Sequence, residues 1–65
     1  MIIRWTNTYS REIGFVKSID YKNRHFNNTF NENEAKKFVS IASAEKAINK
    51  LHEYGEDELN IFEII

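Results

Sequence analysis

The chain has 65 residues, of which 42% are hydrophobic and 29% are charged, and its formal net charge is −1. This length allows one domain, residues 1–65, and excludes a large core, because a chain of this size buries only about 60% of the surface that its unfolded form exposes. The absence of cysteine excludes disulfides and cysteine-based zinc sites and favours a reducing cytoplasm. With neither an export signal nor a run of roughly 18 apolar residues, no association with a membrane is expected.

The charges are distributed unevenly along the chain. Residues 1–30 carry five basic and two acidic residues, whereas residues 31–65 carry four basic and eight acidic ones. Such a two-signed molecule is a poor general binder of polyanions, since nucleic-acid affinity at physiological salt requires several aligned cations. The charges are either ordinary solvated groups, or those at residues 53–58 form an acidic surface offered to a basic partner.

Two segments rich in β-branched and aromatic residues, 2–9 and 13–22, open the chain. The intervening Ser10-Arg11-Glu12 has a length that suits a β-hairpin, so we predict two antiparallel strands. The alternation of apolar and polar side chains is imperfect in both segments. Because glycine inside a strand often marks a bulge, we expect the register to shift near Gly14.

The connection that follows, residues 23–33, contains five asparagines, whose side chains favour turns. Phe26 and Phe30 indicate that this segment is anchored to the domain. Either a short third strand or a pinned loop around Thr29 and Phe30 is expected.

A short helix is predicted next. Asn31 and Glu34 have the spacing of a capping box, which predicts a helix of one to two turns that includes Ala35 and Phe38. The acidic side chains then occupy its first turn, where the helix dipole favours them.

Residues 40–55 carry the clearest helical pattern in the chain. Ser40 or Ser43 can accept a hydrogen bond from the first free amides, and Gly55 can adopt the left-handed conformation that ends a helix. Between them, apolar side chains recur every three or four residues and predict one apolar face, made of Ile41, Ala44, Ala47, Ile48, Leu51 and Tyr54.

Residues 59–65 predict a final strand that is apolar on both faces. If Phe62 and Ile64 face the helix, Ile61 and Ile65 face the other side of the sheet. Together the elements predict an α+β fold of ββαβ type: a hairpin, a short helix, the main helix and a C-terminal strand. The small antiparallel three-stranded sheet has the order 2-1-3, with helix on one face; parallel pairing of the final strand with the second is the alternative.

The sequence contains no constellation typical of catalysis. Gly14 and Gly55 are the only glycines, which excludes a glycine-rich phosphate loop. His52 with Glu53 and Glu56 comes nearest to a cation site, but a histidine is also favoured at a helix C-terminus by the dipole. We predict that the protein is not an enzyme and has neither a metal site nor a cofactor.

Two binding surfaces are predicted instead. One is the final strand with the turn before it, where an acidic rim and an apolar centre would receive another protein or a second copy of the chain: Glu56, Asp57, Glu58, Ile61 and Ile65. The alternative is a nucleic-acid surface of aromatic and basic residues on the hairpin: Arg4, Trp5, Arg11, Lys17, Lys22 and Arg24. The hairpin aromatics could equally form the core under the helix.

Residues 14–19 read Gly-Phe-Val-Lys-Ser-Ile, Thr29 is followed by Ala35 and Phe38, an Ala-Glu-Lys-Ala-Ile helix follows at 44–48, and the chain closes with Ile-Phe-Glu-Ile-Ile. In these motifs the chain resembles small accessory proteins encoded by phages and prophages of low-GC bacteria. The resemblance implies a non-catalytic protein in the cytoplasm of a bacterial host. It would bind and block or modulate a host protein, including nucleases of host defence.

Overall fold

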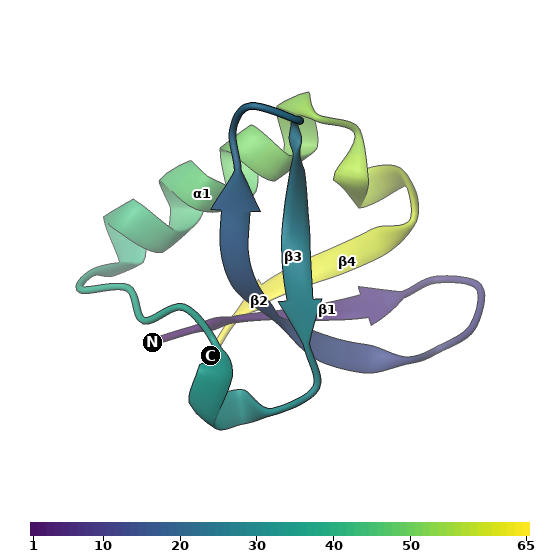
Figure 1. Ribbon diagram of the computed structural model, residues 1–65, viewed down its shortest axis with the longest axis horizontal. Coiled ribbons are helices and arrows are strands. Elements are labelled where there is room, and N and C mark those ends of the chain that lie inside the picture. Colours follow the sequence, from purple (N-terminus) through teal and green to yellow (C-terminus); the bar gives the residue numbers. More distant parts are fainter.

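A four-stranded antiparallel sheet carries one α-helix on one face in the computed structural model, which describes all residues 1–65 (Figure 1). The elements are β1 (Ile3–Asn7), β2 (Ile13–Asp20), β3 (His25–Thr29), the 3-10 turn η1 (Glu32–Glu34), α1 (Ile41–Glu53), the 3-10 turn η2 (Glu56–Glu58) and β4 (Asn60–Ile64). The strands lie in the order β3-β2-β1-β4. The predicted α+β class is confirmed, but the prediction of a three-stranded sheet is wrong.

The additional strand is β3, which pairs antiparallel with β2, so of the two alternatives for residues 23–33 the short strand is confirmed. Its two asparagines disfavour a strand, but its neighbours compensate for them. Asn27 Nδ2 donates to Ser18 Oγ at 2.9 Å, and the ring of Phe26 packs edge-on to that of Phe62 at 5.5 Å. Because β3 joins the sheet beside β2, the observed order differs from the predicted order 2-1-3, whose three strands correspond to β2-β1-β4.

The hairpin of β1 and β2 is present, with its turn set by Asn7. The side-chain oxygen of Asn7 accepts hydrogen bonds from the amides of Tyr9 and Ser10, each at 2.9 Å, which ends β1 there. The register shift of β2 lies between Val16 and Ser18 and not near Gly14, so the predicted position of the bulge is wrong.

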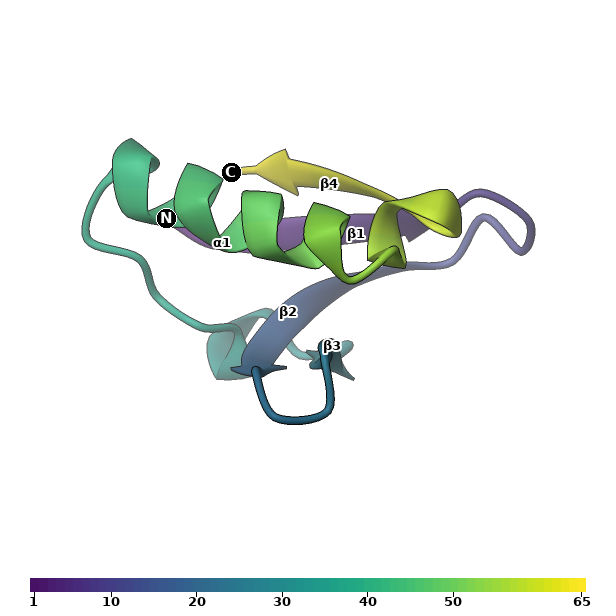
Figure 2. The same cartoon turned by 90° about the horizontal axis from the view of Figure 1, so that it is seen from above.

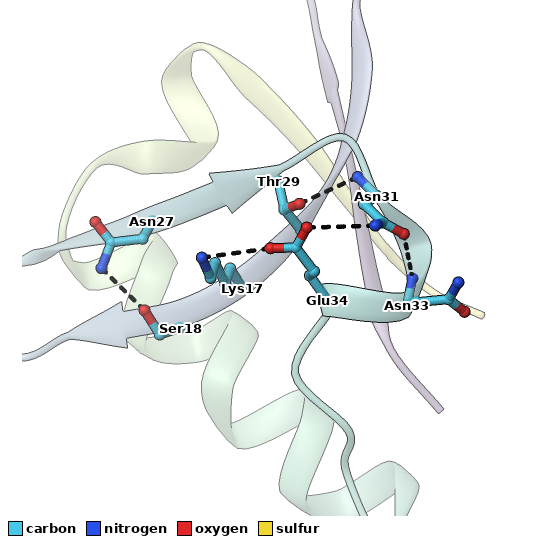
Figure 3. A network of polar contacts seen from close by, with 7 residues as sticks. All are labelled: Lys17, Ser18, Asn27, Thr29, Asn31, Asn33 and Glu34. Carbon is cyan, nitrogen blue, oxygen red and sulfur yellow. Dashed lines mark hydrogen bonds and ion pairs between the residues drawn. The ribbon is translucent and has the colours of Figure 1, made fainter.

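The short helix is a single 3-10 turn, η1, and ends before the predicted Ala35 and Phe38. Asn31 caps it as predicted, accepting from the amide of Asn33 at 2.9 Å, while its side-chain nitrogen donates to Glu34 at 3.3 Å (Figure 3). The turn stops because Ala35 is extended, and the next amide, that of Lys36, donates to the carbonyl of Val16 at 2.9 Å.

The main helix is confirmed as α1. Ser40 Oγ accepts from the amide of Ser43 at 3.1 Å, and the Ser43 side chain bonds back to Ser40 as a capping box. At the other end Gly55 has a φ of +80°. Of the predicted apolar face, Ile41 is 57% exposed, because the sheet meets the helix only from Ala44 onward.

The core lies between α1 and the sheet, and α1 lies over β1 and β4 when the molecule is seen from above (Figure 2). Its buried side chains are Ile3, Trp5, Val16, Ala44, Ala47 and Leu51. Phe62 and Ile64 pack against this cluster, so β4 turns these two residues towards the helix as predicted. The single helix is too short and too polar to cross a membrane.

Candidate functional site

The sheet face turned away from α1 presents three half-exposed isoleucines, and we call it the open face. Ile13 and Ile61 both lie opposite Thr6 and so share the face that Trp5 does not occupy. Ile65 directly follows β4 and lies opposite Ile2. The exposed fractions of Ile13, Ile61 and Ile65 are 55%, 56% and 45%. The structure therefore places the predicted Ile61 and Ile65 on one surface and adds Ile13 to it.

An ion pair crosses the middle of the open face. Arg4 Nη2 donates to Glu63 Oε1 at 3.0 Å, and the side chains are 36% and 48% exposed. An exposed pair of this kind contributes about 0–1 kcal/mol to stability. The Nε of Arg4 is buried and has no acceptor within the protein.

The open face continues to a free strand edge at β4. β4 pairs only with β1, and Ile2 and Ile65 exchange both backbone hydrogen bonds at 3.0 Å. Because bonded and non-bonded pairs alternate in antiparallel strands, the backbone groups of Asn60, Phe62 and Ile64 point away from β1. An unpaired edge of this kind can accept a further strand.

A hollow of about 530 Å³ lies where this edge meets the end of α1. Its lining includes the predicted Asp57 and Ile61, together with Ile48, His52 and Phe62. The structure therefore brings Asp57 of the acidic turn next to Ile61 of the final strand.

The acidic turn is divided between two surroundings. Asp57 Oδ2 contacts Nδ1 of His52, whereas Glu56 lines a separate cavity of about 420 Å³ with Trp5 and Phe30. Glu58 is exposed. The partner of His52 is therefore Asp57, which the sequence pattern of His52, Glu53 and Glu56 missed, and no three potential metal ligands gather anywhere in the protein.

The residues of the alternative nucleic-acid surface are dispersed. Trp5 is 5% exposed, so its ring is not available for base stacking and belongs to the core. Lys17 pairs with Glu34 at 3.5 Å (Figure 3).

The other cations of that set lie apart from one another. Arg4 is paired on the open face, and the guanidinium of Arg24 lies 4.9 Å from the ring centre of Tyr54. Arg11 and Lys22 occupy the two hairpin turns, after β1 and after β2 respectively. No aromatic platform with aligned cations results on the hairpin.

A third hollow, of about 510 Å³, was not predicted from the sequence. It lies beside α1 and is lined by every basic residue of the chain's second half: Lys36, Lys37, Lys46 and Lys50. No binding site was predicted for these four lysines, because acidic residues outnumber them in residues 31–65. The repeated Lys-Lys at 36 and 37, and the four-residue spacing of 46 and 50, were the available signals.

Comparison with known proteins finds no protein-family model, no curated protein and no solved structure that matches this chain.

Proposed function

We propose that this protein is a non-catalytic module that binds another protein through the open face and the adjoining edge of β4. The observation that carries the proposal is the set of three isoleucines, each about half exposed, on one sheet face beside the free edge of β4. Exposed apolar residues gathered on one surface and bordered by polar groups, here Thr6 and the Arg4–Glu63 pair, are a feature of protein-binding sites.

The size of the molecule supports a mode of action in which the protein covers part of its partner's surface. Its two longest extents are 30 and 24 Å, whereas a standard protein interface takes about 800 Å² from each partner. An interface of that size would occupy most of the open face. Binding would then leave little of this side free and would cover a comparable area of the partner.

The charges around the site favour a basic partner. Asp57 lines the hollow next to Ile61, and η2 consists of three consecutive acidic residues. Acidic groups at the rim accelerate encounter with a positively charged protein, while the desolvated isoleucines hold it. The resemblance to phage and prophage accessory proteins supports the setting, a bacterial cytoplasm in which a host protein is blocked or modulated.

Replacement of Ile61 by lysine tests the proposal, with Ile41→Lys as the matched control. The two side chains are 56% and 57% exposed, and both variants change the net charge equally, but only Ile61 lies on the open face. A protein captured from bacterial lysate is purified, and its affinity for each variant is measured by calorimetry. We expect Ile61→Lys to weaken binding by about tenfold or more, because a lysine at the desolvated centre is poorly tolerated.

The circular dichroism spectra of both variants should match that of the parent protein. Equal binding by the two variants would show that the open face is not the site. Loss of self-association in sedimentation, in the Ile61→Lys variant alone, would identify a second copy as the partner. Capture of nucleic acid in place of protein would instead favour the hairpin alternative.

A further inference from the structure

The lysine-lined hollow beside α1 is a groove between the helix and two other segments. Ser43, Lys46, Ala47 and Lys50 form the helix wall. The opposite wall is Tyr21, at the end of β2, with residues 36–39. Figure 2 shows this last segment running from η1 to the start of α1. The groove therefore depends on three separate parts of the chain.

The groove has a strong positive charge for a protein whose net charge is −1. No carboxylate lines it. Lys50 pairs with Glu53 at 3.2 Å, while Lys36, Lys37 and Lys46 have no carboxylate within ion-pair distance. Three unneutralised ammonium groups in one hollow attract an anionic ligand.

The walls of the groove are largely apolar between these charges. Val39 is 97% exposed and Tyr21 is 59% exposed, so both leave hydrophobic surface in contact with solvent. The half-buried ring of Phe38 and the methyl of Ala47 complete the apolar lining. A ligand that fits must carry apolar groups as well as negative charge.

We propose that this groove binds an acidic, apolar segment of a partner protein, at a second site independent of the open face. Nucleic acid fits less well, because base stacking requires free aromatic faces. Lys36 Nζ lies 5.7 Å from the ring centre of Phe38 and occupies one face of that ring, so Tyr21 alone offers an exposed ring, and a single ring is no platform for successive bases. In such a segment, carboxylates would pair with the ammonium groups of the groove, and leucine or phenylalanine side chains between them would contact its apolar walls.

The placement of the two sites allows both to be occupied together. α1 forms one wall of the groove, and the open face is the sheet surface that α1 does not cover. A protein with both sites can hold its main partner and a second acidic segment, of the same or another protein, at once. This would raise the overall affinity without any new contact at the open face.

The probe is a fluorescein-labelled short peptide in which aspartate and glutamate alternate with leucine and phenylalanine. The double variant Lys37→Glu, Lys46→Glu is compared with the parent by fluorescence anisotropy. The control double variant is Arg11→Glu, Lys17→Glu, which changes the net charge equally but leaves the groove intact. We expect the groove variant to weaken binding about tenfold or more, and the control by less than about threefold.

A further pair of measurements separates apolar recognition from charge alone. Val39→Ser should weaken binding of the peptide but leave binding of poly-glutamate unchanged. In the parent protein, titration with the peptide should shift the amide resonances of Val39 and Ala47, a result that depends on no variant. The proposal fails if the groove variant binds like the parent, or if oligothymidine of similar length binds more tightly than the peptide. Unchanged peptide binding by Ile61→Lys would show that this site is distinct from the open face.

Discussion

The indole of Trp5 packs directly against the backbone of Gly14. The two residues lie opposite one another on β1 and β2, and a Cβ at position 14 would lie 2.4 Å from Cζ2 of the indole. The indole Nε1 donates to the carbonyl of Phe15 at 3.2 Å, which holds the ring over the glycine. Gly14 is therefore required for close approach of the indole to the backbone and not for a bulge.

Gly14→Ala should destabilise the protein by about 1–3 kcal/mol, since the indole must move out of a packed position. Gly55→Ala is the contrasting variant, because its Cβ meets nothing within 4 Å and only the φ of +80° opposes it, at about 1–2 kcal/mol. Chemical unfolding measures both losses. Only Gly14→Ala should change the fluorescence of Trp5, the single tryptophan, in the folded state; an unchanged spectrum would contradict the contact.

Asp20, at the end of β2, has a pKa below its usual value of 3.8. The main cause is the hydrogen bond that Asn23 Nδ2 donates at 2.9 Å, followed by the bond from the Asn23 amide. A carboxyl whose pKa is lowered by folding stabilises the fold above the unfolded pKa, and this contribution is lost as the pH falls through the folded pKa. The loss of this stabilisation is therefore confined to pH values below about 4.

Asn23→Ala should raise the pKa of Asp20 towards 3.8, because the strongest donor to the carboxylate is removed. An NMR titration of the Asp20 side chain measures this shift. His25, which lies 3.3 Å from the same carboxylate, contributes less. A His25→Ala variant with a larger shift than Asn23→Ala would reverse this order of causes.

At the scale of the elements, α1 and the strands under it depend on a few side chains. Leu51 is fully buried, whereas Asn49, two residues earlier, is exposed. Leu51→Ala should cost about 2–5 kcal/mol, a large part of the stability of a small domain, while Asn49→Ala should change it by about 0.5 kcal/mol or less. Thermal unfolding of the two variants provides the measurement. Similar melting temperatures would show that the buried face of α1 is assigned wrongly.

α1 and β3 differ in how well the sequence pattern predicts them. The periodicity of residues 40–55, with Ser40 and Gly55 at its ends, was sufficient to predict α1 because helical hydrogen bonds are local. β3 has no comparable local signal. Its asparagines favour turns, and it forms because β2 offers an unpaired edge and Phe62, more than thirty residues later, covers Phe26.

At the scale of the whole molecule, the sheet divides the protein into two sides with different chemistry. One side holds α1, the core and, at its margin, the lysine groove; the other is the open face with its isoleucines and the Arg4–Glu63 pair. The Ile61→Lys and groove variants therefore predict separable losses, each at one surface. A variant that abolished both interactions without unfolding the protein would contradict this division.

The sequence by itself determined the α+β class, the hairpin, α1 and its caps, and the alternation that turns Ile61 away from the helix. These depend on propensities and periodicities within a few residues. Only the tertiary structure decided that β3 is a strand, that Trp5 is buried, and that Ile13 joins Ile61 on one face. It alone gathered the lysines of a predominantly acidic half into one groove. The reason is that each of these features pairs residues distant in the chain, and such pairs follow from strand register and helix packing, which no local pattern encodes.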